Sequence, residues 1–293
     1  MNTSSSPITY RRMIHSDIPA GLALCRACHW NQLSRDWECF LNWSSDGCRV
    51  AIKEDRVVGT VTTLSYRDRR QQPRFDWIAM VLVDPLERRQ GIGQRLMQEA
   101  LDYLGDRATI RLDATPAGHP VYRKLDFADE YGLLRMEASA DARPVCIRDP
   151  ATRLMVEDDL PQVLNMDDAV FGADRSLLLR WLFHGAPDYA RICVRDGRMT
   201  GYMFGRHGFR FEHLGPVIAE DRRSADLLVQ ACLFDHRTEP FILDAAQGDA
   251  DWLQCLQSIG FKEQRPFIRM CRGENRYPGN PGKQYAILGP EFG

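Results

Sequence analysis

The sequence predicts an α/β protein made of two halves of similar plan. Three observations support this prediction. The length of 293 residues favours two ordinary domains over one. Apolar, β-branched runs alternate with runs that have apolar residues at helical spacing. The same order of elements also occurs twice along the chain, at a nearly constant offset.

The composition is that of a soluble globular protein, with 44% hydrophobic and 27% charged residues. A net charge of −2 gives no general electrostatic reason to bind nucleic acid or a membrane surface. No apolar run is long enough to span a bilayer. The segment Met1–Pro7 is polar and lacks the apolar stretch of a signal peptide, so we expect a frayed leader and a cytoplasmic protein.

Nine cysteines without a secretory signal are expected to be reduced thiols. The run Cys25-Arg26-Ala27-Cys28-His29 fits the pattern for covalent attachment of c-type haem. That attachment requires export to an oxidising compartment, and packing of a helix face explains the same residues. No second Cys/His pair with zinc-finger spacing accompanies the run. We therefore expect neither haem nor a metal.

The elements of the first half are predicted in order. The run His15–Pro19 opens a helix with an N-cap residue and an early proline. A hairpin follows, with strands at 49–54 and 57–61. Residues 75–83 are apolar and β-branched, as a buried strand should be. The next helix has its apolar face at Ile92, Leu96, Ala100, Leu101 and Leu104 and ends at Gly105, and a short helix at 119–127 completes the half.

The second half repeats this order. The helix start at Asp159 lies 142 residues after Asp17, and Gly201 in the second hairpin lies 142 residues after Gly59. The second hairpin turns at Asp196-Gly197, a dipeptide typical of such turns. The repeat predicts an N-terminal domain at 1–140, a linker at 141–150, a C-terminal domain at 151–272 and a Gly/Pro-rich extension at 273–293. The extension is predicted to pack on one half or to remain a loose end.

The most informative segment is 81–96, where a strand runs into a glycine-bearing turn that opens a helix. Such a turn directs several backbone N–H groups toward one point, where the helix dipole also favours negative charge. A diphosphate is the expected ligand. No Gly-Lys-Ser/Thr follows, which argues against a nucleotide triphosphate loop, and the glycine spacing differs from that of a dinucleotide-binding fold.

The segment resembles the acyl-CoA loop of the GCN5-related N-acetyltransferases. Their pattern is Gln/Arg-x-x-Gly-x-Gly/Ala, and Arg88, Gly91 and Gly93 occupy its three defined positions. The resemblance implies a mixed sheet with helices on both faces, and acetyl-CoA as co-substrate. The double plan further resembles tandem members of this superfamily that carry a divergent C-terminal domain.

The resemblance also implies roles for individual residues. The main chain at Val81 and Val83 would hold the pantetheine arm, and one amide would polarise the acetyl carbonyl. The phenol of Tyr122 would protonate the departing CoA thiolate. A half-buried core tyrosine is the alternative for that residue. The diphosphate would lie against the loop residues Arg88, Arg89, Gln90, Gly91, Ile92, Gly93 and Gln94.

The general base and the acceptor pocket are less well specified. Candidates for the base are Asp76, His29 and His119, each of which is also explained as a structural or solvated residue. Trp30 and Trp37 would line a pocket for a cationic amine, or belong to the core. His213 in the second half is a further pocket candidate.

The second half lacks the features of a donor site. Its equivalent loop at 215–225 has no Gly-x-Gly, and the acidic Glu220 and Asp221 would repel a diphosphate. Leu256 stands where the first half has Tyr122 and cannot donate a proton. We therefore expect one donor site per chain, in the first half.

The predicted function is transfer of an acetyl group from acetyl-CoA to a primary amine by direct attack in a ternary complex. The acceptor is a small-molecule amine or a peptide. Two alternatives remain open: an acyl-CoA-binding regulatory or scaffolding protein without turnover, and a transferase with a longer acyl or aminoacyl donor. Monomer and homodimer are equally compatible with the sequence, because the second half could take the place of the partner subunit that single-domain relatives often use.

Overall fold

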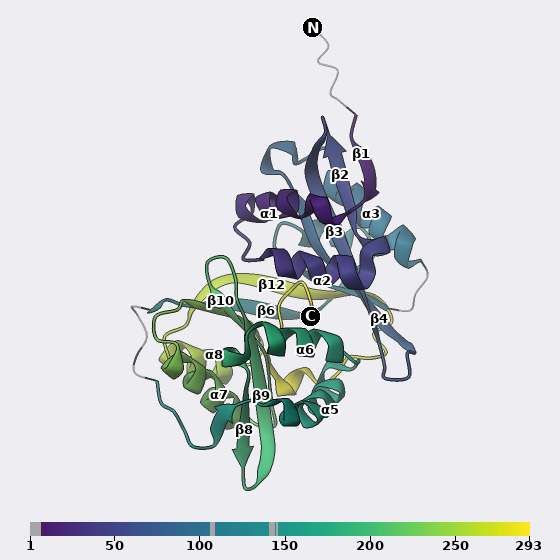
Figure 1. Ribbon diagram of the computed structural model, residues 1–293. Coiled ribbons are helices and arrows are strands. Elements are labelled where there is room, and N and C mark those ends of the chain that lie inside the picture. Colours follow the sequence, from purple (N-terminus) through teal and green to yellow (C-terminus); the bar gives the residue numbers. More distant parts are fainter. Residues whose placement is uncertain (1–6, 106–108, 141–143, 145) are drawn as a thin grey trace. The chain divides into compact units, whose positions relative to one another are not determined.

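The computed structural model describes residues 7–105, 109–140, 144 and 146–293 (Figure 1). The chain forms two compact units. The first unit comprises the residues up to Ser65 together with Phe75–Arg111, and the second comprises Tyr66–Arg74 together with Leu112–Gly293. Most of the predicted leader, and part of the predicted linker at 141–150, lie outside the described residues.

In the first unit the strands lie in the order β1-β2-β3-β4-β5. Neighbouring strands are antiparallel from β1 to β3, whereas β4 and β5 are parallel, so the sheet is mixed. The strand bounds are β1 Thr9–Arg12, β2 Arg49–Lys53, β3 Arg56–Arg67, β4 Pro73–Val83 and β5 Thr109–Ala114. The helices are α1 Ile18–Ala27, α2 Ser34–Ser44 and α3 Ile92–Leu104.

The predicted apolar face of α3 is confirmed. All five predicted positions are buried, and Met97 joins them. Gly59 of β3 allows this helix to approach the sheet closely, because a Cβ there would lie 2.9 Å from Leu96 and 3.0 Å from the carbonyl oxygen of Leu82. Packing of α3 against β3 fixes the start of the helix at the end of β4, where the predicted anion loop lies.

In the second unit the strand order is β12-β6-β11-β10-β9-β8-β7, and β13 pairs with β10. The strand bounds are β6 Ala128–Ala138, β7 Thr152–Leu154, β8 Arg191–Arg195, β9 Arg198–Arg206, β10 Glu212–Ala219, β11 Phe241–Ala246, β12 Lys262–Gly273 and β13 Gln284–Ala286. The helices are α4 His119–Arg123, α5 Leu160–Phe171, α6 Ser176–Gly185, α7 Arg222–Asp235 and α8 Ala250–Ser258.

Strand β6 belongs to the first half of the sequence repeat but lies inside the second compact unit. It pairs with β11 on one side and with β12 on the other, in both cases antiparallel. The compact units therefore differ from the halves of the repeat: the repeat predicts a boundary near 140, whereas contacts assign 112–138 to the second unit.

Helices cover both faces of the sheet in the second unit. Met203 of β9 packs in the core cluster that contains Leu228 and Val229 of α7. Its neighbour Tyr202 points to the opposite face, where its hydroxyl donates a hydrogen bond to Asp167 of α5. Successive residues of a strand point to opposite faces, so α5 and α7 lie on opposite sides of β9.

Both halves begin with the same local structure. The Asp17 carboxylate accepts a hydrogen bond from the Ile14 amide at 2.9 Å and pairs with Arg11 at 2.7 and 2.8 Å. Asp159 likewise accepts from the Val156 amide at 2.8 Å and pairs with an arginine, Arg153. Each carboxylate closes a short 3₁₀ turn before the proline-bearing helix rather than capping the helix itself. The shared structure supports the predicted repeat.

The C-terminal extension packs on the second unit. Residues Gln284–Ala286 form β13 on β10, and Leu288 and Phe292 are fully buried. The Tyr66 hydroxyl donates a hydrogen bond of 2.6 Å to the Phe292 carbonyl oxygen. Of the two predicted states of this extension, the packed one is therefore correct.

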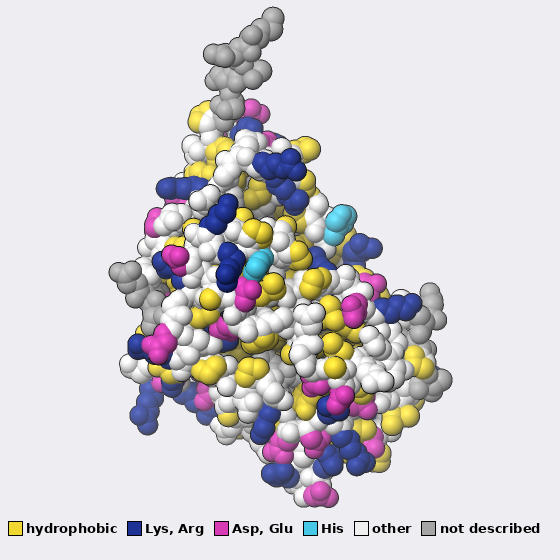
Figure 2. Space-filling model, turned by 180° about the vertical axis from the view of Figure 1, so that it is seen from behind, with side chains coloured by type: hydrophobic (Ala, Val, Ile, Leu, Met, Phe, Trp, Pro, Cys, Tyr) yellow, Lys and Arg dark blue, Asp and Glu magenta, His cyan; other side chains and the backbone are white. Residues whose placement is uncertain are grey.

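Acidic and basic side chains are intermixed on the face of the protein shown in Figure 2. None of the helices that the structure describes has both the length and the apolar character needed to cross a bilayer.

Candidate functional site

The end of β4 has an irregular backbone. Met80 has a positive φ of 52°, which is rare for a residue other than glycine. Its carbonyl oxygen accepts a hydrogen bond of 2.8 Å from the Thr60 hydroxyl. Among the described residues, the pairing of β4 with β5 ends at Trp77 and Arg111, although β4 continues to Val83. The residues of β4 after Trp77 thus have backbone N–H and C=O groups that are not bonded to β5 among the described residues.

The loop after β4 leaves a run of amides without partners. Arg89 and Gly91 both have left-handed φ angles, 66° and 78°, and Gly91 is the N-cap of α3 with no side chain to cap the helix. Within the described chain, no acceptor lies at the backbone N–H groups from Arg88 to Gln94. Alternating right- and left-handed residues turn successive amides toward one point, and such a nest at a helix N-terminus binds anions.

Both carboxylates of the loop are engaged, because Asp84 accepts a hydrogen bond of 3.0 Å from the Leu86 amide and Glu87 has side-chain partners. Glu87 accepts a hydrogen bond of 2.7 Å from Lys53 and one of 2.8 Å from Gln90. The bond from Lys53, followed by that from Gln90, lowers the pKa of Glu87. Arg88 folds back over the strand end, with its guanidinium 3.4 Å from the Val83 carbonyl oxygen and 3.3 Å from the Cys28 sulfur. The loop therefore presents amides and arginines to an incoming anion.

The residues predicted for the diphosphate loop thus lie together in one unit. Arg89, Gln90 and Gln94 are exposed, whereas the Ile92 side chain is buried in the core, so Ile92 offers only its amide. A Cβ placed at Gly91 meets no atom within 4 Å, so the space in front of the helix is open. This geometry is compatible with a bound diphosphate.

Tyr122 lies on α4 in the second unit. Its side chain is 8% exposed and packs against Gly118 and Phe127, whose ring centroid is 6.2 Å away. The hydroxyl makes no hydrogen bond to any residue that the structure describes. Burial raises the pKa of Tyr122, so the phenol keeps its proton near neutral pH and can act as a donor but not as a base.

Two of the candidates for the general base have side-chain partners. Asp76 is buried and accepts a hydrogen bond of 2.5 Å from the Ser65 hydroxyl. His119 lies 2.8 Å from Asp129. His29 is an exposed residue with φ of 57°, and its backbone amide closes the last turn of α1. The contacts of Asp76 and His119 give these two residues a structural task, and the catalytic role of all three candidates stays a prediction.

The residues predicted for the acceptor pocket are found in different settings. Trp37 is fully buried, and its ring packs against Gly21, where a Cβ would lie 3.0 Å away. Trp30 is half-buried at the end of α1. His213 is 2% exposed, and its two ring nitrogens face Arg206 and Asp244, each at 3.0 Å. Trp37 and His213 therefore serve the core of their units.

The corresponding helix start in the second half carries its own anion. The Asp221 carboxylate accepts a hydrogen bond of 2.8 Å from the Ser224 amide, so it caps α7, and it pairs with Arg195 at 2.7 Å. A carboxylate at this place occupies the amides that a diphosphate would need. Leu256, where the first half has Tyr122, is fully buried.

A second obstacle to donor binding in the second half was not visible in the sequence. Among the described residues, β10 pairs with β11 only at Glu212 and His213, so the two strands separate beyond that point. Strand β13 pairs with β10 there, and the Ile287 amide donates a hydrogen bond of 3.0 Å to the Asp244 carbonyl oxygen of β11. A Cβ at Gly215 would lie only 2.0 Å from the Ile287 carbonyl oxygen. The C-terminal extension thus fills the gap between these strands.

No group of three or more His, Cys, Asp or Glu residues is placed to hold a metal ion within the described parts of the chain. The nine cysteines are free thiols, including Cys25 and Cys28 of the haem-like run.

Family comparisons account for both halves. Residues 22–127 match the Acetyltransferase (GNAT) family, and residues 163–286 match an Acetyltransferase (GNAT) domain. The chain is a tandem GNAT protein. It is accordingly an enzyme of the acyltransferase class. The resemblance to the GCN5-related N-acetyltransferases, first indicated by the loop motif, is confirmed.

Two curated relatives resemble most of this GNAT protein. Holothin acyltransferase of Pseudoalteromonas sp. (strain SANK 73390) is 25% identical over 265 residues, which cover 90% of this chain and 87% of the relative. The uncharacterized N-acetyltransferase YitH of Bacillus subtilis (strain 168) is 27% identical and covers 75% of this chain and 77% of its own. Both names support acyl transfer of the GNAT kind.

Solved structures confirm the fold. A putative acetyltransferase from Pyrococcus horikoshii superimposes with a TM-score of 0.79 at 23% identity, covering 98% of this chain and 96% of that one. A tandem GNAT protein from the clavulanic acid biosynthesis pathway gives a TM-score of 0.62 at 13% identity, with 90% and 98% coverage. The mixed α/β sheet and the double domain plan predicted from the sequence are thus correct.

Proposed function

We propose that this GNAT protein transfers an acetyl group from acetyl-CoA to a primary amine, and that the donor binds at the start of α3. The proposal rests on the backbone amides from Arg88 to Gln94, which have no acceptor within the described chain. They lie at the open, glycine-capped start of that helix. A diphosphate would accept several of these N–H bonds and gain from the helix dipole. Among the described residues β4 does not pair with β5 beyond Trp77, which supports a pantetheine arm along Val81 and Val83 on that side of the strand.

The proposed reaction is direct attack. The uncharged amine nitrogen forms a bond to the thioester carbonyl carbon, negative charge gathers on the carbonyl oxygen, and the carbon–sulfur bond then breaks. A backbone amide near Met80, where β4 is irregular, stabilises that charge. The amine loses one proton to water or to a positioned base, and CoA leaves as a thiolate that takes up a proton from Tyr122, which regains a proton from the solvent. The products are an N-acetyl amide and CoA.

The role of Tyr122 is testable with a conservative substitution. Replacing Tyr122 by Phe is expected to lower kcat about 100-fold, because proton transfer by a positioned side chain typically contributes at least that factor. The affinity for acetyl-CoA should not change, since the hydroxyl makes no hydrogen bond to the described protein. Steady-state CoA release and equilibrium binding measure the two effects. Leu125→Ala, at a half-buried position in the turn after the same short helix, is the control for loss of packing. An unchanged kcat in the Phe variant contradicts the proton-donor role.

Donor stoichiometry tests the asymmetry between the halves. Calorimetric titration with acetyl-CoA should give one site per chain, because Asp221 and β13 occupy the equivalent positions in the second half. Two sites of similar affinity would contradict this account. The variant Asp221→Ala is expected to lose about 1 kcal/mol of unfolding free energy with its helix cap, and still to bind one equivalent.

One screen of acyl-CoAs against amines identifies both the acyl donor and the amine acceptor. The name of the Pseudoalteromonas relative is that of an acyltransferase and states no acyl length, so a longer acyl donor is a second candidate function. Acyl-CoAs of increasing chain length should be compared against a panel of small amines and peptides, with thiol release as the readout. Acetyl-CoA is expected to turn over fastest. Tight binding of every donor without turnover of any amine would instead indicate a regulatory acyl-CoA-binding protein.

A further inference from the structure

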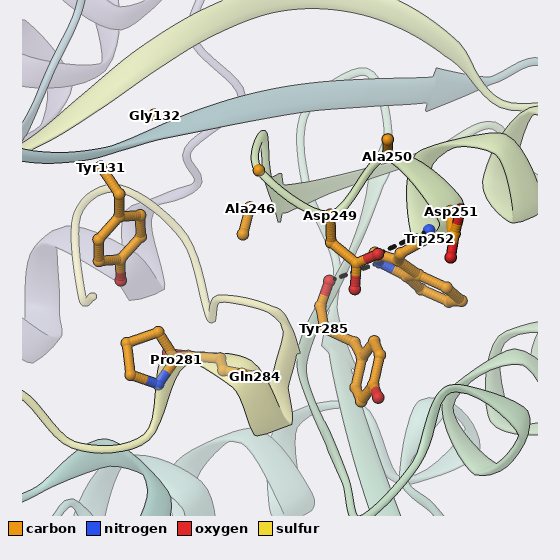
Figure 3. A pocket seen from close by; sticks show the side chains of 12 residues that line it. Tyr131, Gly132, Ala246, Asp249, Ala250, Asp251, Trp252, Pro281, Gln284 and Tyr285 are labelled. Carbon is orange, nitrogen blue, oxygen red and sulfur yellow. Dashed lines mark hydrogen bonds between the residues drawn. The ribbon is translucent and has the colours of Figure 1, made fainter.

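The second unit contains a cavity of about 580 Å³ that the proposed reaction does not use. Figure 3 shows its lining, which comes from the end of β11, the start of α8, the middle of β6 and the C-terminal extension. Cavities of this size hold a small organic molecule. The residues that line it are Tyr131, Gly132, Ala246, Gly248, Asp249, Ala250, Asp251, Trp252, Pro281, Gly282, Gln284 and Tyr285.

The charged groups of this cavity are acidic. Asp249 and Asp251 line it, and no lysine or arginine does. Arg222, the first residue of α7, pairs with both carboxylates: its guanidinium lies 3.0 Å from Asp251 and 3.6 Å from Asp249. One guanidinium against two carboxylates leaves a local charge of −1. The site therefore favours a cation and opposes the phosphates that the α3 loop attracts.

Aromatic rings supply the rest of the wall. Tyr285 and Trp252 fix one another, with ring centroids 5.3 Å apart and the Trp252 indole N–H donating to the Tyr285 carbonyl oxygen at 2.8 Å. Tyr131 lies across the cavity, its hydroxyl held by Arg269 at 2.8 Å. Tyrosine rings beside carboxylates are a setting in which organic ammonium groups bind, because the ring faces are electron-rich.

Gln284 provides an independent sign of a ligand. It is 8% exposed and lines the cavity, and the nitrogen of its side-chain amide has no hydrogen-bond partner within the described chain. A buried donor left without an acceptor destabilises the protein. A ligand that carries an acceptor oxygen would provide the missing partner.

We propose that this cavity binds a small organic cation, a primary amine with an attached aryl group that carries an acceptor oxygen. The ammonium lies between Asp249 and Asp251, and the aryl group lies against Tyr285 and Tyr131. The acceptor oxygen meets the amide nitrogen of Gln284. This site is separate from donor binding, so it does not depend on the proposed reaction and can be tested in the absence of acetyl-CoA.

Three matched probes test the charge preference by calorimetric titration of the full chain. The probes are tyramine, 4-(2-hydroxyethyl)phenol and 3-(4-hydroxyphenyl)propionate, which share a phenol with its acceptor oxygen and differ in charge. The amine is expected to bind at least 10-fold more tightly than the alcohol, and the carboxylate should not bind. Absence of amine binding, or equal affinity for amine and alcohol, overturns the proposal.

Substitutions that are expected to change the amine affinity in opposite directions locate the site. Asp251→Asn should weaken amine binding about 10-fold, and its side chain is exposed enough for the fold to tolerate the change. Arg222→Gln should tighten binding, because it removes the one cation beside the carboxylates. Asp158→Asn removes an exposed carboxylate elsewhere in the same unit and should have no effect. Equal affinity in all three variants places the amine at another site and overturns the proposal.

Discussion

Replacing Gly91 by Asp is expected to weaken acetyl-CoA binding about 1,000-fold, whereas Gly91→Asn should retain most of the affinity. The two side chains have the same shape, and both tolerate the left-handed φ of 78° better than other residues do. No atom lies within 4 Å of a Cβ at this position, so neither substitution creates a clash in the unliganded protein. The pair therefore isolates the effect of one negative charge at the helix start.

The magnitude follows from electrostatics. A carboxylate about 4 Å from a phosphate near a protein surface costs about 4 kcal/mol, which corresponds to about a 1,000-fold change in the dissociation constant. Equilibrium titration with acetyl-CoA measures it, and raising the salt concentration should narrow the difference between the variants. Equal affinity of the Asp and Asn variants would show that the diphosphate does not lie at Gly91. Urea denaturation of both proteins controls for a common loss of stability.

This loop was predictable from the sequence because its signals are local. The left-handed residue at Gly91, the apolar face that starts at Ile92 and the preceding strand all lie within about twenty residues of one another. Hairpins and amphipathic helices are likewise specified by short-range patterns. The order of elements in both halves could thus be predicted, and the match to two GNAT families confirms the double plan.

The features that the sequence did not predict depend on long-range contacts. Strand β13 has only three residues, and nothing in its composition specifies β10 as its partner. Strand β6 likewise pairs with β11 and β12, which follow it by about a hundred residues or more. Pairing of this kind is determined by tertiary packing, which local propensity does not encode. Prediction from the repeat alone therefore missed both the filled gap in the second half and the way contacts divide the chain.

Several candidate site residues are buried and pair with other residues of the core. Histidine, tryptophan and carboxylate residues suggest chemistry when they are read from a sequence, but the same groups also satisfy one another inside a core. His213 is an example. It is a pocket candidate in the sequence, and the structure surrounds it with Asp244, Arg206 and Glu291, all of which are at most 3% exposed. Sequence patterns alone could not distinguish these two settings.

That buried network makes Asp244 the residue whose loss should most destabilise the second unit. Its carboxylate accepts two hydrogen bonds of 2.7 Å from Arg135 and lies 3.0 Å from His213. Replacing it by Ala is expected to lower the free energy of unfolding by about 3–5 kcal/mol, because the Arg135 charge would remain buried without its partner. Chemical denaturation measures the loss. The control is Asp196→Asn in the exposed β8–β9 turn, which should change stability by less than about 0.5 kcal/mol.

The same network predicts how stability depends on pH. Burial, together with the nearby Arg206 charge, lowers the pKa of His213 below its ordinary value of 6.5, so the folded protein holds this ring neutral. The unfolded chain then binds the proton more readily, and stability should fall as the pH decreases below about 6.5. Asp244 has a lowered pKa because Arg135 and His213 stabilise its charge against burial, so its contribution is lost only in stronger acid, below its unfolded pKa of 3.8. His213→Gln should therefore flatten the profile between pH 7 and 5 and leave the loss in stronger acid. A profile identical to that of the unaltered protein would show that His213 does not titrate on unfolding.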